Sequence, residues 1–104
     1  HSSSYISPTS IIGQSVTVLV HAVVHTNAQI GDFCCINSGA IVEHDCKIGK
    51  NVFIGSHSVI KGGAVIGDYC VVGAGTVVGS VDVPPYSLVI GNPAVVKKSY
   101  YKKK

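Results

Sequence analysis

The residues with the clearest chemical potential lie in the segment Glu43-His44-Asp45, where an imidazole stands beside a carboxylate. An imidazole can act as a general base near neutral pH, and a neighbouring carboxylate can orient the ring or support its charge. Gly62 lies further along the chain, at three six-residue intervals from His44. If positions at that interval stack, a ligand could reach both the imidazole and the backbone amide of Gly62. A base beside a preorganised amide donor is the arrangement that acyl transfer requires.

A six-residue repeat must position these groups. Every sixth residue from Ile6 onward is Ile or Val, without a slip, at Ile6, Ile12, Val18, Val24, Ile30, Ile36, Val42, Ile48, Ile54, Ile60, Ile66, Val72 and Val78. A period of six fits neither a helix face nor simple strand alternation. β-branched residues favour strands, and the recurring glycines permit turns between them. Three six-residue sides then form one triangular coil with the aliphatic side chains inside, so positions three repeats apart stack.

We therefore expect an all-β parallel solenoid whose coils stack at about 4.8 Å. Its coils should span residues 5–83, a little over four turns, because the phase breaks after Val78 and Pro84-Pro85 cannot continue a central strand. The segment 84–104 should add a last short strand at residues 87–90, a turn at residues 91–93, and a short helix or tail. Residues 1–104 are treated as one domain.

Three cysteines, Cys34, Cys46 and Cys70, share an inward position that mostly holds small residues, whereas Cys35 points outward. Cys34 and Cys70 are two coils apart, about 10 Å, and a disulfide needs Cα atoms within about 7 Å. These thiols are expected to be free and to pack as small hydrophobic groups. Free thiols indicate a reducing compartment, which favours the cytoplasm.

Composition excludes several classes of protein. The chain is 46% hydrophobic and 12% charged, so it is not disordered. Its apolar runs are too short for a membrane span. The net charge of +3 comes from the end of the chain, which carries Lys97, Lys98 and Lys102–Lys104. The rest of the chain is slightly acidic and there is no Arg, so a nucleic-acid surface is not expected. The lysine tail either contacts phosphate or is a solvated terminus.

Two segments resemble a known family. "NSGAIVEHDCKIG" (residues 37–49) and "VPPYSLVIGNPAVVKK" (residues 83–98) are similar to the hexapeptide-repeat acetyltransferases, in the branch of sialic-acid O-acetyltransferases and nucleotide 4-amino-sugar N-acetyltransferases. The resemblance implies a left-handed parallel β-helix that assembles as a homotrimer. It implies direct acetyl transfer from acetyl-CoA to the amine of a nucleotide-linked 4-amino-4,6-dideoxy sugar, without a metal. In this branch a small sugar-binding domain usually precedes the prism, so we expect one in the parent protein.

The resemblance also implies roles for residues. His44 would be the general base, Asp45 would polarise it, and the amide of Gly62 would bind the thioester carbonyl. Asn37 would lie near the substrate. The residues implied to bind the cofactor are Gly62, Gly73, Ala74, Gly75, Pro93, Lys97 and Lys98. The sequence departs from the family at Phe53, where many relatives have a second histidine, and at Val95, where they have a lysine; the phosphate contacts would then move to Lys97, Lys98 or the tail.

Three alternatives remain open. The acceptor could be a hydroxyl, as in a sialic acid or a serine-like substrate. A zinc enzyme of the γ-carbonic-anhydrase type would use some of His21, His25, His44 and His57. His21 and His57 are two coils apart, about 10 Å, and zinc ligands must converge to about 2 Å; His25 and His44, on neighbouring coils, could supply two ligands. A structural or ice-binding prism would require a regular outward ladder of residues such as Thr, and the outward residues are irregular.

Overall fold

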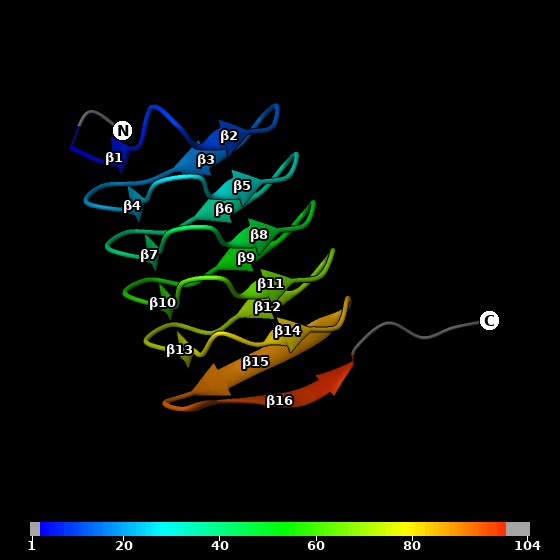
Figure 1. Ribbon diagram of the computed structural model, residues 1–104. Coiled ribbons are helices and arrows are strands. Elements are labelled where there is room, and N and C mark those ends of the chain that lie inside the picture. Colours follow the sequence, from blue (N-terminus) through cyan, green and yellow to red (C-terminus); the bar gives the residue numbers. More distant parts are fainter. Residues whose placement is uncertain (1–2, 100–104) are drawn as a thin grey trace.

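The computed structural model describes residues 3–99, which wind into a parallel β-solenoid with three short strands in each coil (Figure 1). The strands are β1 (Tyr5–Ile6), β2 (Ile11–Ile12), β3 (Thr17–Val18), β4 (Val23–Val24), β5 (Gln29–Ile30), β6 (Cys35–Ile36), β7 (Ile41–Val42), β8 (Lys47–Ile48), β9 (Phe53–Ile54), β10 (Val59–Ile60), β11 (Val65–Ile66), β12 (Val71–Val72), β13 (Val77–Val78), β14 (Asp82–Val83), β15 (Ser87–Gly91) and β16 (Ala94–Ser99). No helix that could cross a membrane occurs among the described residues. The expected left-handed parallel β-helix is confirmed as the fold class.

Each strand from β1 to β12 pairs in parallel with the strand one coil later, and the partners are three repeats apart along most of the prism. Ile6 pairs with Val24, and Ile41 pairs with Val23 above it and Val59 below it. Three sheets result, in the orders β1-β4-β7-β10-β13, β14-β11-β8-β5-β2 and β16-β15-β12-β9-β6-β3. The stacking of positions one coil apart, on which the site prediction depends, is therefore a property of the fold.

The core is a column of the repeated aliphatic side chains. The second residue of the two-residue strands points inward, and Val24, Ile36 and Ile54 are fully buried. The small residues two positions before each strand's inward residue close the corners, and Ala22, Ala40 and Ala64 are also fully buried. Burial of this apolar column is the main stabilising term, because each two-residue strand contributes few hydrogen bonds of its own.

The last coil differs from the expectation. The side between Val78 and Val83 is one residue shorter than the others, so β14 and β15 pair with β11 and β12 in a register that is one position short of a full coil. The coils thus continue through β15 instead of ending near residue 83, and there are about five of them. Pro84 is tolerated because β14 is the edge strand of its sheet, so no further strand needs the amide that proline lacks.

The chain end is a strand where the sequence suggested a short helix or tail. After a turn at Asn92-Pro93, β16 folds back antiparallel on β15. The β-branched pair Val95 and Val96 favours a strand, and the outer edge of β15 offers backbone groups with which it can pair. The predicted lysine tail, Lys102–Lys104, lies outside the described residues.

The cysteines are free, as predicted. Cys34, Cys46 and Cys70 are at most 1% exposed, and Cys35 is half-buried. Each buried thiol donates to a backbone carbonyl of the next coil, for example Cys46 Sγ to Lys61 O at 3.0 Å. Burial raises the pKa of all three thiols, because the charged thiolate is poorly solvated inside the prism.

This shift predicts a loss of stability at alkaline pH. A thiol whose pKa is raised by folding stabilises the fold fully below its unfolded pKa, and that stabilisation is lost as the pH rises through the folded pKa. We expect the free energy of unfolding in urea to fall between neutral pH and about pH 10. The fall should be smaller in Cys46→Ala than in the wild type. An equal fall in both proteins would show that Cys46 does not take part.

Candidate functional site

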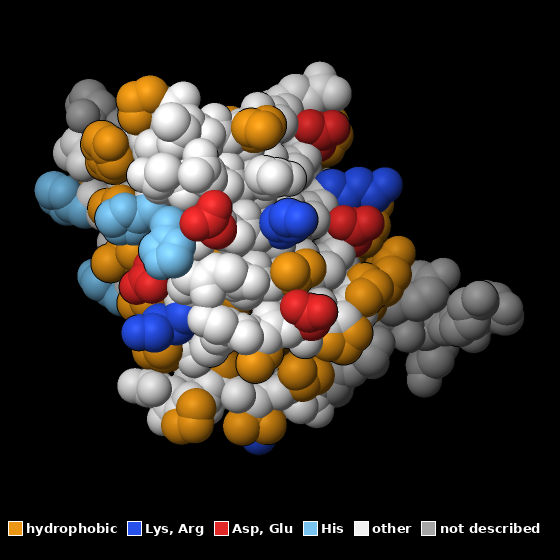
Figure 2. Space-filling view, viewed as in Figure 1, with side chains coloured by type: hydrophobic (Ala, Val, Ile, Leu, Met, Phe, Trp, Pro, Cys, Tyr) orange, Lys and Arg blue, Asp and Glu red, His pale blue; other side chains and the backbone are white. Residues whose placement is uncertain are grey.

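Three stacked turns form one edge of the prism and carry the predicted catalytic residues. The turn after β4 holds Thr26, the turn after β7 holds His44, and the turn after β10 holds Gly62. Backbone hydrogen bonds join them, from Asp45 N to Thr26 O at 3.0 Å and from Gly63 N to His44 O at 3.1 Å. Figure 2 shows histidine side chains gathered on one side of the molecule beside acidic ones. This edge is exposed, so a ligand can approach it from solvent.

His44 and Asp45 form the only ion pair found among the side chains that the structure describes, those of residues 3–97. Nδ1 of His44 lies 3.0 Å from Oδ2 of Asp45, and the two side chains are 67% and 59% exposed. Asp45 has a positive φ of 62°, a conformation that Asp tolerates at tight turns. Since a carboxylate oxygen can only accept, Nδ1 is the donor in this contact, which in the neutral imidazole leaves the lone pair on Nε2. This pair holds the tautomer that a general base needs, and its exposure means that it adds little stability.

Gly62 lies directly against the free nitrogen of that ring. A Cβ added at Gly62 would stand 2.7 Å from His44 Nε2 and 2.8 Å from its Cε1. No side chain other than hydrogen fits there while the imidazole stays in place. The absence of a side chain at Gly62 therefore lets the imidazole lie against this residue, and the two residues stack one coil apart.

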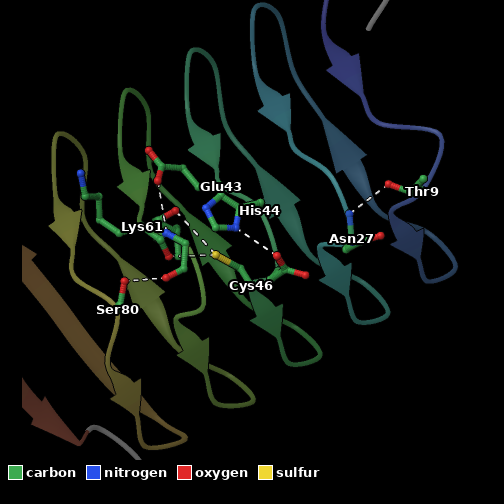
Figure 3. A network of polar contacts seen from close by, with 10 residues as sticks. Thr9, Asn27, Glu43, His44, Cys46, Lys61 and Ser80 are labelled. Carbon is green, nitrogen blue, oxygen red and sulfur yellow. Dashed lines mark hydrogen bonds and ion pairs between the residues drawn. The ribbon is translucent and has the colours of Figure 1, made fainter.

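Two further residues hold the Gly62 peptide groups, one from each neighbouring coil (Figure 3). The Gly62 amide donates to Oε1 of Glu43 at 3.2 Å. The hydroxyl of Ser80 donates to the Gly62 carbonyl. Sequence reasoning assigned no role to either residue. The spacing could have revealed Ser80, which follows Gly62 by one coil, but not the direction of the Glu43 side chain.

The other predicted residues lie on a different edge of the prism. Asn37 follows β6, and its Oδ1 accepts from the Ser38 amide at 2.7 Å. Gly73, Ala74 and Gly75 follow β12 on the same edge, and the Ser58 hydroxyl donates to the Gly73 carbonyl at 2.8 Å. A Cβ at Gly75 would meet nothing within 4 Å, so the backbone there is open. The turns after β6 and β12 thus form a second edge, apart from the edge of His44.

The remaining predicted residues are at the end of the chain. Pro93 lies in the turn before β16, and Lys97 is an exposed residue of that strand. The backbone of Lys98 pairs with Leu88, and its side chain lies outside the described part of the structure. Phe53, on the outside of β9, is 41% exposed. In the described part of the chain, no hydrogen bond or ion pair joins Phe53, Pro93 or Lys97 to the edge of His44.

Within residues 3–99, no three His, Cys, Asp or Glu side chains come close enough together to hold a metal ion. His25 and His44 lie on the same edge, in turns of neighbouring coils, but the described chain adds no third ligand to them. A structural zinc site needs four ligands and a catalytic one needs three. The described chain alone therefore does not form the zinc site considered from the sequence.

Comparison with known proteins identifies the class of protein that this chain resembles. The family profile "Bacterial transferase hexapeptide (six repeats)" matches residues 45–80. A search of curated proteins finds no match. Solved structures that resemble the chain are hexapeptide-repeat acetyltransferases, so the resemblance inferred from the repeats and motifs is confirmed.

Three solved structures illustrate this likeness. The acetyltransferase domain of PglB from Neisseria gonorrhoeae, in complex with acetyl coenzyme A, is 28% identical with a TM-score of 0.71, over 92% of this chain and 55% of that one. A mutant of perosamine N-acetyltransferase from Caulobacter crescentus, in complex with CoA and GDP-perosamine, is 33% identical with a TM-score of 0.68, over 94% and 55%. Soybean serine acetyltransferase is 35% identical with a TM-score of 0.80, over 88% and 41%. The chain thus spans about half the length of these proteins.

Proposed function

We propose that this chain is the β-helical part of an acetyltransferase that moves an acetyl group from acetyl-CoA to the amine of a nucleotide-linked amino sugar, of the 4-amino-4,6-dideoxyhexose type. The observation that carries the proposal is the contact between His44 and Gly62. The imidazole, which Asp45 contacts at 3.0 Å, lies against Gly62 with Nε2 where a Cβ would stand, so no side chain of residue 62 separates the base from this stretch of backbone. The perosamine enzyme, which binds CoA and GDP-perosamine, supports this class of substrates.

The proposed reaction is a direct transfer in a ternary complex. His44 Nε2 removes a proton from the sugar amine while the amine nitrogen attacks the thioester carbon. The amide of Gly62 donates to the carbonyl oxygen as it becomes an oxyanion. The carbon–sulfur bond then breaks and CoA leaves as the thiolate, which takes up a proton. Asp45 accepts from Nδ1 throughout and stabilises the imidazolium that forms.

A trimer would bring the two edges of the prism together. In one chain, the edge of His44 is separate from the edge of Gly73, Ala74 and Gly75, and a triangular prism cannot fold one onto the other. In the proposed homotrimer, the first edge of one protomer faces the second edge of its neighbour. The pantetheine arm would lie along the open backbone at Gly75, and Asn37 would approach the sugar. Pro93, Lys97 and Lys98 would then contact the nucleotide end of CoA.

The test is incubation of the chain with acetyl-CoA and a panel of nucleotide amino-sugars and hydroxy-sugars, followed by mass spectrometry. We expect a mass gain of one acetyl group on an amino sugar. We expect no such product with His44→Ala. A gain on hydroxy-sugars alone would contradict the amine as acceptor.

A hydroxyl acceptor is the second candidate. Its support is the likeness to soybean serine acetyltransferase, at 35% identity over 88% of this chain. The same base and amide would serve a hydroxyl, because the proton removed and the oxyanion formed occupy equivalent positions. Serine and a sialic acid in the same acceptor panel would distinguish the two candidates.

A further inference from the structure

Glu43 directs its carboxylate at the amide to which the proposed reaction assigns the oxyanion. Oε1 of Glu43 accepts from Gly62 N at 3.2 Å, across the boundary between two coils (Figure 3). The Glu43 side chain is half-buried, unlike those of His44 and Asp45, which are exposed. The contact therefore places this carboxylate on the donor beside the base.

One amide proton cannot serve two acceptors well. A backbone N–H is a single donor, and a second oxygen on it weakens both hydrogen bonds. The acceptor already present carries a negative charge, and the oxygen of the tetrahedral intermediate carries one as well. Two like charges that share one donor repel each other, most strongly where water is excluded. Acetyl transfer at Gly62 thus requires Glu43 to leave the amide.

The neighbouring coil offers the displaced carboxylate a partner. Lys61 is the residue three repeats after Glu43, so it lies one coil further along the same column, about 4.8 Å away between backbones. Lys61 is exposed, and its ammonium forms no ion pair within the described part of the chain. Rotation of the Glu43 side chain would exchange the amide for this ammonium. The exchange needs no movement of the backbone.

We propose that Glu43 competes with the acyl carbonyl of acetyl-CoA for the Gly62 amide, and so sets the affinity for the acylated form of the cofactor. The inference rests on the proposed function. It predicts an effect on binding that is selective for the acylated cofactor, because CoA without an acyl group has no carbonyl that could accept from the amide. Removal of the Glu43 carboxylate strengthens binding of acetyl-CoA and leaves binding of CoA unchanged.

The experiment measures Kd for acetyl-CoA and for CoA by calorimetry with the wild type, Glu43→Ala and Glu43→Gln. We expect Glu43→Ala to lower the Kd for acetyl-CoA by about 3- to 10-fold, the equivalent of one net hydrogen bond. Glu43→Gln keeps an acceptor oxygen without the charge, so its gain in affinity for acetyl-CoA should be smaller. Asp82→Asn removes one exposed carboxylate from the last coil and is the control for charge alone. It should change neither Kd.

Amide hydrogen exchange gives a readout that does not depend on any ligand. In the free protein, the Gly62 amide should exchange about 3- to 10-fold faster in Glu43→Ala than in the wild type, because its acceptor is gone. Faster exchange of the Gly62 amide hydrogen in Glu43→Ala, together with a gain in affinity for acetyl-CoA but not for CoA, supports the competition. An equal gain for CoA and acetyl-CoA, or no gain, overturns it while the proposed function stands. Failure of the wild type and both variants to bind either ligand overturns the proposed function, and the competition with it.

Discussion

Replacement of His44 by alanine should lower the rate of acetyl transfer by about 100- to 10,000-fold, the usual contribution of one general base. The imidazole is the only group in the described chain that combines a lone-pair nitrogen with contact to Gly62. Without it, the amine must lose its proton to water, which is a weaker base. The loss should appear in kcat, with little change in the affinity for acetyl-CoA, because the side chain acts on the acceptor. Steady-state kinetics with the amino sugar identified by mass spectrometry measure both constants.

His25→Ala is the matched control for this variant. His25 is also an exposed histidine on the same edge, one coil earlier, and it follows β4 as Glu43 follows β7. Its replacement removes an imidazole of the same size and charge without touching the pair of His44 and Asp45. We expect its kcat to stay within about twofold of the wild type, as for a surface substitution away from the site. A loss under about tenfold in His44→Ala would remove His44 from the role of base.

Gly62→Ala should reduce acetyl transfer by about 100-fold, the cost of misplacing a catalytic group by about 1 Å. The added methyl group would lie 2.7 Å from His44 Nε2, closer than real Cβ atoms approach other heavy atoms, so the imidazole must rotate away. Rotation carries Nε2 from the acceptor and lengthens the 3.0 Å contact between Nδ1 and Asp45. Because His44 is 67% exposed, the ring can move without disturbing the core. We therefore expect lost activity with little change in the melting temperature.

Gly79→Ala separates this effect from a general cost of adding a methyl group. A Cβ at Gly79 would meet nothing within 4 Å, and neither Gly62 nor Gly79 has a positive φ. The two substitutions make the same chemical change on one edge of the prism, one with a clash and one without. Gly79→Ala should keep full activity. Full activity in Gly62→Ala would show that His44 need not occupy the observed position.

Much of the fold could be predicted because the repeat is redundant. In a triangular coil, an aliphatic residue at every sixth position points into the core. Thirteen positions carry this signal, so the pattern would remain visible if one of them departed from it. The pattern underestimates the last coil because Pro84-Pro85 indicates the end of a strand, although an edge strand tolerates proline. The segment after Pro93 carries no repeat. Its pairing as β16 depends on the free edge of β15, which exists only once the last coil has closed.

The candidate site, like the fold, could be predicted from the sequence only in part. Stacking of His44 on Gly62 follows from the spacing of three repeats, because backbone pairing fixes the register of neighbouring coils. The spacing says nothing about rotamers. Whether Nδ1 of His44 turns to Asp45, and whether Glu43 turns to solvent or to the Gly62 amide, depends on side-chain torsions with several staggered minima.

The sequence by itself determined the period, the parallel β-helix and the column in which His44 and Gly62 meet, because these depend on a pattern of side-chain types repeated along the backbone. Only the tertiary structure decided which ring nitrogen of His44 faces Gly62, and that Glu43 and Ser80 hold the Gly62 peptide groups from opposite sides. The physical reason is that the stabilisation from burying the repeated aliphatic side chains adds up over every coil. Each of these contacts instead depends on the rotamer of one side chain and is worth about one hydrogen bond.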